Sequence, residues 1–130
     1  MTVLNDEARA LFAGPNLAHI ATLLPDGRPH SVPVMIDVEG QYLAFFTSPT
    51  SRKGRNLAVG DRIAISVTEP DNWARSALVR DRVVKRAGGD AGWQIVDRIF
   101  AKYTCGPYPQ REDREAFLVK PVHVIVPTFG

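Results

Sequence analysis

Apolar residues recur along the chain in short runs that turn-forming residues separate, a pattern typical of small antiparallel β proteins. The turns hold glycine, proline, asparagine or aspartate, the residues that tight turns favour. Because the connections are short, we expect an antiparallel barrel rather than a parallel sheet with alternating helices. The six predicted strands cover residues 17–24, 29–38, 42–47, 62–69, 75–87 and 117–126.

The first two predicted strands form a hairpin, because residues 25–28 (Pro-Asp-Gly-Arg) make a turn between them. The second strand carries Pro29 and Pro33, which cannot donate hydrogen bonds to a neighbouring strand. We therefore expect this strand to lie at an edge, or to bulge where the prolines occur. Either arrangement leaves backbone groups free for a ligand or a second subunit.

Three short helices are predicted to interrupt the strands. The first begins at Asn5 or Asp6 and ends near Phe12. The second follows the third strand and ends at Gly60, and the third begins at Asp90, with apolar residues at helical spacing. Those apolar residues are Val96, Ile99, Phe100 and Tyr103. The predicted fold class is mainly β with α: a six-stranded, antiparallel, Greek-key-like barrel with three helices.

The segment after the third strand has the composition of an anion site. Thr47 and Ser48 end the strand, and hydroxyls, cations and an amide follow at Ser51, Arg52, Lys53, Arg55 and Asn56. Free backbone N–H groups and the positive end of a helix dipole would point the same way as these cations, so a phosphate is the natural guest. The alternative is a solvated basic face on a short surface helix. The glycine spacing of a Walker loop is absent.

Length and charge narrow the function classes. A chain of 130 residues is long enough for one domain, which we take to span residues 1–130. The net charge of +2 does not by itself favour nucleic acid or membrane binding. A single cysteine, Cys105, excludes an internal disulfide, and with no leader-like or membrane-spanning run the sequence predicts a cytoplasmic protein. The cations fall into two groups along the chain: Arg52, Lys53, Arg55 and Arg62 form the first, and Arg75, Arg80, Arg82, Lys85 and Arg86 form the second.

Several motifs resemble, in order, the split barrels of the pyridoxamine-phosphate-oxidase-like superfamily. Residues 21–29 followed by Ser31-Val32-Pro33-Val34 resemble the opening hairpin of these proteins. The segment Arg52-Lys53-Gly54-Arg55-Asn56-Leu57, with Asp61-Arg62-Ile63-Ala64 after it, resembles their deazaflavin-dependent branch. The order continues at residues 69–73, 102–103 and 107–109, so the resemblance covers roughly residues 6 to 126.

The resemblance implies a split-barrel homodimer with two cofactor sites at the subunit interface. In such proteins coenzyme F420, a deazaflavin, or FMN lies with its ring against the second strand, and its phosphate reaches the segment after the third strand. Lys53 and Asn56 match the phosphate-binding positions, with Ser51 and Arg52 beside them and Thr47 and Ser48 at the strand end. Ser31, Pro33, Val34 and Met35 match the strand that backs the ring, and Trp73 matches an aromatic near the pocket.

The expected activity is transfer of hydride from reduced F420 to a small conjugated or unsaturated acceptor. The cofactor would carry the chemistry, so no catalytic residue is assigned and none of the usual nucleophile sets is found. His30 lies beside the presumed ring and could donate a proton in the substrate pocket, although an outward-facing strand residue is the alternative. His19, His30 and His123 do not cluster, which argues against a metal. The rivals are an FMN-dependent oxidoreductase and a non-catalytic protein that binds a flavin or tetrapyrrole.

Overall fold

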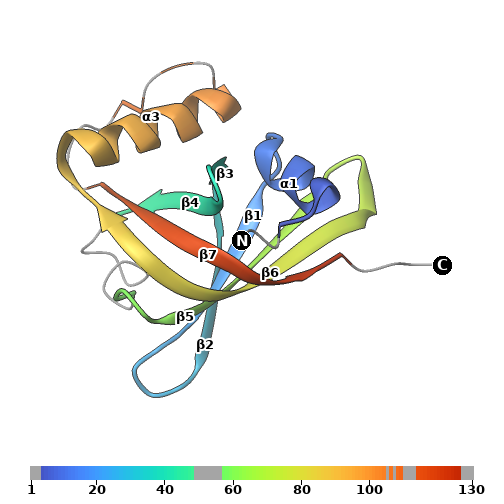
Figure 1. The fold of residues 1–130 in the computed structure, drawn as a ribbon, viewed down its shortest axis with the longest axis horizontal. Helices are drawn as coiled ribbons and strands as arrows, with labels where there is room; N and C mark the ends of the chain where they lie inside the picture. Colours follow the sequence, from blue (N-terminus) through green and yellow to red (C-terminus); the bar gives the residue numbers. More distant parts are fainter. Residues whose placement is uncertain (1–3, 49–56, 105, 107, 110–113, 127–130) are drawn as a thin grey trace.

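The computed structural model describes residues 4–48, 57–104, 106, 108–109 and 114–126. In this part of the chain two helices accompany seven strands, which form one twisted antiparallel sheet (Figure 1). The helices are α1 (Asp6–Ala13) and α3 (Gly89–Thr104). The strands are β1 (Ala18–Leu23), β2 (Pro29–Val34), β3 (Ile36–Glu39), β4 (Tyr42–Thr47), β5 (Arg62–Glu69), β6 (Asn72–Ala87) and β7 (Glu115–Ile125).

The sheet closes on itself through one stretch of chain that bends at Met35. The strand order is β2-β1-β5-β6-β7-β4-β3, so the two ends of the sheet are consecutive in sequence. The predicted fold class is confirmed, but the predicted count of six strands is wrong by one. The second predicted strand is two strands, because its first half pairs with β1 and its second half with β4. The predicted helix before Gly60 falls mainly on residues 49–56, outside the described residues.

The tight turns lie where the sequence predicts them. Gly27 and Gly40 both have positive φ, at 88° and 61°, which only glycine adopts at little cost. The hairpin between β5 and β6 is irregular, because Thr68 pairs with Ser76 whereas Glu69 pairs with Asn72. Residues 73–75 therefore form a bulge on β6, and that strand begins at Asn72 instead of the predicted Arg75.

The main core fills the barrel interior and is closed at one end by α1. Leu11 and Phe12 of this helix are buried with the inward-facing residues of β1, β3, β4, β5, β6 and β7. Phe45 and Phe117 stack inside the barrel with ring centroids 5.2 Å apart. A fully buried side chain of this size contributes about 1.5–3 kcal/mol to folding, so this pair is a large part of the core.

A second core lies on the outside of the barrel, beneath α3. Val96 and Ile99 of this helix pack against Ala44, Phe46 and Leu118. The strands β4 and β7 are thus covered on both faces, which explains their nearly continuous apolar runs. In contrast, the residues of β1 and β5 alternate between buried and more exposed positions, and no described helix covers their outer faces (Figure 1). None of the described helices is long and apolar enough to cross a membrane.

Candidate functional site

The bend at Met35 leaves two strands with unpaired edges. In the described part of the chain β2 pairs only with β1, and β3 pairs with β4 no further than Ile36 opposite Phe45. Among the described strands Phe46 therefore pairs with β7 on one side and with no strand on the other. Unpaired backbone groups require partners from water, a ligand or another chain. The barrel thus offers two hydrogen-bonding edges that meet at one corner.

The edge of β2 accepts more hydrogen bonds than it donates. Pro29, Ser31 and Pro33 are exposed and lie at alternate positions of this strand. A proline is tolerated in a sheet where its nitrogen faces the unpaired side, and alternate residues of a strand face the same side. The edge therefore presents three carbonyl groups and, from Ser31 alone, one N–H group. This pattern suits a planar heterocycle that carries an N–H donor beside carbonyl acceptors.

The remaining residues predicted for the cofactor lie around the same corner, so far as they are described. Val34 faces the barrel core and Met35 packs against the cluster under α3, so these two support the edge from behind. Thr47 and Ser48 are half-buried at the end of β4, two and three positions beyond Phe45. Ser51, Arg52, Lys53 and Asn56 lie outside the described residues.

His30 and Trp73 lie in different regions of the chain. His30 is half-buried opposite Thr22, near the Asp26-Gly27 turn. Trp73 is 75% exposed in the bulge of β6, beside the turn between β5 and β6. Within one chain the structure does not bring them into one pocket. Across the described residues no three histidine, cysteine, aspartate or glutamate side chains gather where a metal could bind.

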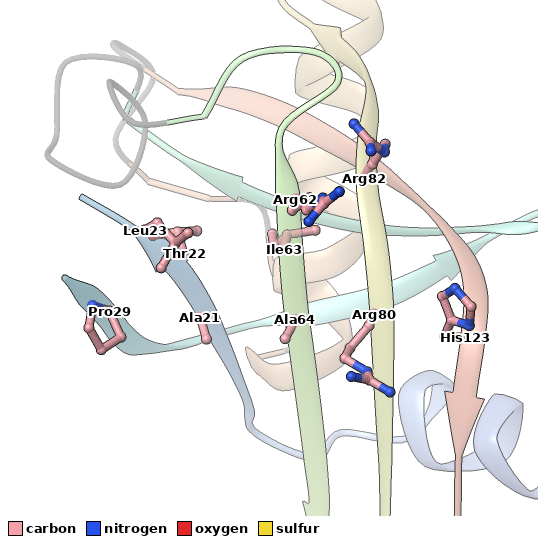
Figure 2. A pocket seen from close by; sticks show the side chains of 10 residues that line it. All are labelled: Ala21, Thr22, Leu23, Pro29, Arg62, Ile63, Ala64, Arg80, Arg82 and His123. Atoms are coloured by element: carbon pink, nitrogen blue, oxygen red, sulfur yellow. The ribbon is translucent and has the colours of Figure 1, made fainter. Parts of the chain in front are cut away.

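A pocket of about 720 Å³ opens on the outer face of the sheet that no described helix covers (Figure 2). This volume is typical of sites for cofactors and small ligands. Three arginines and a histidine contribute its polar groups, whereas β1 contributes mostly apolar ones. The lining residues are Ala21, Thr22, Leu23, Pro29, Arg62, Ile63, Ala64, Arg80, Arg82 and His123.

Two rows of paired residues build the pocket. In the first row Ala21 faces Ala64, which faces Arg80, which faces His123. Because the alanine side chains are small, they leave space for a ligand above this part of the sheet. In the second row Arg62 faces Arg82, and Arg82 faces Lys120 on β7.

Like charges directly opposite each other make this surface unusual. Opposite charges across a strand pair stabilise a sheet by about 0.2–1 kcal/mol, and like charges destabilise it. Arg62 and Arg82 face each other with no acidic residue among those that line the pocket. A concave surface with charge of one sign attracts ions of the other sign. The arrangement is therefore suited to binding anions.

Sequence reasoning separated the arginines that this pocket brings together. It grouped Arg62 with the cations after the third strand, and Arg80 and Arg82 with a second group. Alternation along β5 and β6 does place all three on the outer face. The continuous register that runs from Thr68 opposite Ser76 to Arg62 opposite Arg82 sets which of them face each other, and nothing in the sequence predicts that register.

Two polar residues of α3 fix the position of the bend. Tyr103 donates its hydroxyl to the Asn16 carbonyl at 2.7 Å and accepts from the Ile36 amide at 3.2 Å. Lys102 donates to the carbonyls of Phe12 and Ile36, and its Nζ lies 3.5 Å from Asp37 Oδ1. Ile36 is thereby hydrogen-bonded to α3 through both its amide N–H and its carbonyl. Sequence analysis found Tyr103 through its apolar spacing and missed its hydroxyl.

Burial shifts the pKa of both side chains. Desolvation lowers the pKa of the Lys102 ammonium below 10.5, and the attraction of Asp37 offsets this only in part. Desolvation also raises the pKa of the Tyr103 phenol above 10.0, against the hydrogen bond from the Ile36 backbone. At neutral pH the cluster therefore keeps a neutral phenol that can both donate and accept.

Comparison with known proteins gives one family match and several structural matches. The family described as Pyridoxamine 5'-phosphate oxidase matches residues 4–126. A solved structure of an F420 reductase is 27% identical, with a TM-score of 0.78 over 90% of this chain and 94% of that chain. A search of curated proteins found no match.

Two further structures differ in what they bind. A heme binding protein from Mycobacterium smegmatis is 27% identical with a TM-score of 0.65, and the match covers 92% of this chain and 51% of that chain. An FMN binding protein from Nostoc punctiforme PCC 73102, described as related to pyridoxamine 5'-phosphate oxidase, is 16% identical. It has a TM-score of 0.62 over 83% of this chain and 71% of that chain, which is a likeness of fold.

Proposed function

Since the chain belongs to the pyridoxamine 5'-phosphate oxidase family, we propose that it is a cytoplasmic, homodimeric oxidoreductase that uses reduced coenzyme F420. Its substrate is a small conjugated or unsaturated acceptor. The observation that carries this proposal is the similarity to an F420 reductase over 90% of this chain and 94% of the other. The corner beside Met35 supplies the physical support.

The residues of this corner fit a flavin-type cofactor. When bound, the reduced deazaflavin supplies hydride to the acceptor. The carbonyls and the single N–H of the β2 edge would hold the polar rim of the ring, and Met35 supports that strand from behind. Lys53 and Asn56 would bind the phosphate, with Ser51 and Arg52 beside them and the Thr47 and Ser48 hydroxyls at the strand end. The lysine and tyrosine of α3 hold the bend in place, so the ring meets a preorganised edge.

A second subunit completes the site in this proposal. The β2 edge is open in one chain, and the pocket of one chain contains neither His30 nor Trp73. A dimer that places the Trp73 bulge of one chain near the His30 end of its partner would bring both to one substrate. Size-exclusion chromatography with light scattering tests for the dimer directly.

The cofactor itself is tested by the colour and spectrum of the purified protein. Production in a host without deazaflavins should give a colourless protein that binds added F420 and, when the cofactor is reduced, turns over an acceptor. A yellow protein with bound FMN would instead support the FMN-dependent oxidoreductase, for which the FMN binding relative of like fold gives precedent. A protein that binds heme and reduces no acceptor would support a non-catalytic role, a possibility raised by the 27% identical heme binding protein.

The phosphate corner is tested by Lys53→Ala, with Lys120→Ala as the matched control. Lys120 is exposed on β7, where it faces Arg82, five positions from the residue that faces Thr47. We expect Lys53→Ala to weaken cofactor binding by about tenfold or more, because a charge-assisted hydrogen bond is lost. Both variants should keep the stability of the parent, since surface cations contribute little to it. Equal affinity in the two variants would remove Lys53 from the site.

A further inference from the structure

The arginine pocket on the outer sheet face contains two guanidinium groups without partners. Every other described arginine has one: Arg28 pairs with Asp26, Arg75 with Glu69, Arg86 with Glu115 and Arg98 with Glu39. Arg9, Arg82 and Arg114 donate to a carbonyl or a hydroxyl. Among the described arginines only Arg62 and Arg80 make no hydrogen bond or ion pair, and both line the same pocket.

These two arginines sit where one ligand can reach both. Arg62 faces Arg82, and Arg80 lies two positions from Arg82 along β6, so Arg62 and Arg80 are diagonal neighbours. Diagonal neighbours on adjacent strands have Cα atoms about 7–8 Å apart, within reach of long side chains. In Figure 2 the Arg62 and Arg82 side chains lie near each other, and the Arg80 side chain lies further along β6 and extends away from them. An anion bound by Arg62 and Arg80 would offset the repulsion between the facing arginines.

The apolar side of the pocket indicates what the anion is attached to. Ala21 and Ala64 give a low, flat floor, and Leu23 and Pro29 form a wall beside it (Figure 2). Leu23 is 61% exposed, so an apolar group resting on it would remove surface from water. The pocket of about 720 Å³ is also much larger than a single oxyanion requires.

We propose that this pocket binds a phosphate monoester with a flat apolar body, at a site separate from the cofactor phosphate corner. Arg62 and Arg80 hold the phosphate oxygens, because guanidinium groups match phosphate geometry in two-pronged fashion. Arg82, fixed by its hydrogen bond to the Gly60 carbonyl at 2.9 Å, adds charge from the end of the row. His123, opposite Arg80, supplies a ring nitrogen at the far wall. The apolar body lies on the alanine floor.

The test is titration of the full chain with phenyl phosphate, followed by NMR of the backbone amides. Phenol and inorganic phosphate are titrated alongside to separate the apolar and the anionic contributions. We expect saturable binding of phenyl phosphate, tighter than that of either fragment, with shifts centred on Ala64 and Arg80. Raising the salt concentration should weaken it. Absence of saturable binding would overturn the proposal.

Four variants locate the site. Arg62→Gln and Arg80→Gln should each weaken phenyl phosphate binding by about tenfold or more, because each removes a hydrogen bond to a charged group. Arg28→Gln, an equal change of charge on the exposed turn, and Lys53→Ala, at the cofactor corner, should leave the affinity unchanged. An equal loss in Arg28→Gln would mean diffuse charge attraction only. A loss confined to Lys53→Ala would mean that the ligand occupies the cofactor corner, whose own role would still stand.

Measuring the oligomeric state distinguishes a ligand site from an interface between two copies of the chain. If a second copy of the chain covers the pocket, Arg62→Gln and Arg80→Gln would shift the association equilibrium in light scattering and leave phenyl phosphate affinity unaltered. That result would overturn the ligand site. An unchanged oligomeric state together with weakened binding supports it.

Discussion

Replacing Tyr103 by phenylalanine removes one oxygen atom and tests whether the bend at Met35 is held from α3. The hydroxyl donates to the Asn16 carbonyl at 2.7 Å and accepts from the Ile36 amide at 3.2 Å. The Ile36 side chain is fully buried, so water cannot easily replace the lost acceptor. A buried polar group left without a partner costs about 1–3 kcal/mol, which gives roughly 2–6 kcal/mol for the two groups together. In a chain of 130 residues this lowers Tm by something of order 10 °C.

Urea denaturation measures this loss against a matched control. Tyr42→Phe removes the same oxygen from an exposed tyrosine on β4, which makes no side-chain hydrogen bond in the described structure. We expect that control to stay within about 0.5 kcal/mol of the parent, as surface substitutions usually do. In Tyr103→Phe the amides of Ile36 and Val38 should also exchange faster with deuterium. If Tyr103→Phe and Tyr42→Phe lose the same small amount, the hydroxyl does not fix the bend and the reasoning fails.

Three further changes follow from the same contacts. Gly92→Ala should lower the free energy of unfolding in urea by about 3 kcal/mol or more, because the new Cβ would lie 2.2 Å from the Ala87 carbonyl oxygen. In the control Gly88→Ala the new Cβ has no neighbouring atom within 4 Å, so this change should cost under about 1 kcal/mol. Burial lowers the pKa of Lys102 below 10.5, so the unfolded chain keeps that proton to a higher pH than the folded chain does, and the free energy of unfolding rises with pH toward 10.5. Lys102→Met should flatten this rise in urea denaturation between about pH 8 and 10. An unchanged pH dependence in the variant would refute the argument. Arg62→Gln should raise the stability of the ligand-free chain by about 0.2–1 kcal/mol at low salt, and a loss of stability would show that the facing arginines do not repel each other.

Local patterns were sufficient for much of the fold. The turns at Gly27 and Gly40 need positive φ, and glycine beside polar residues marks such places in any sequence. The third helix was predicted from the spacing of Val96, Ile99 and their neighbours, and both residues are buried. The prolines of β2 predicted an edge strand, and β2 is one. In each case the information lies within a few residues.

Features that depend on distant contacts could not be predicted in this way. The alternation of residues 29–38 is the same before and after Met35, so only the choice of partner, β1 or β4, divides that stretch into two strands. Similarly, the register that pairs Arg62 with Arg82 is interrupted before the turn between β5 and β6, so it cannot be counted from that turn in the sequence. Helical spacing identifies the Tyr103 ring as apolar, but the partners of its hydroxyl belong to segments more than sixty residues away.

The bulge in β6 has a consequence for how this protein can diversify. Thr68 faces Ser76 on one side of it and Glu69 faces Asn72 on the other, so residues 73–75 interrupt the pairing without setting it. Shortening or lengthening this segment would leave the pairing of β5 with β6 from Ser76 to Arg82 in place. Trp73 could thus be exchanged, or the segment rebuilt around a new substrate, without realigning the arginine rows. Mutational libraries confined to these three positions should therefore yield mostly folded proteins, a freedom that few other parts of a closed barrel allow.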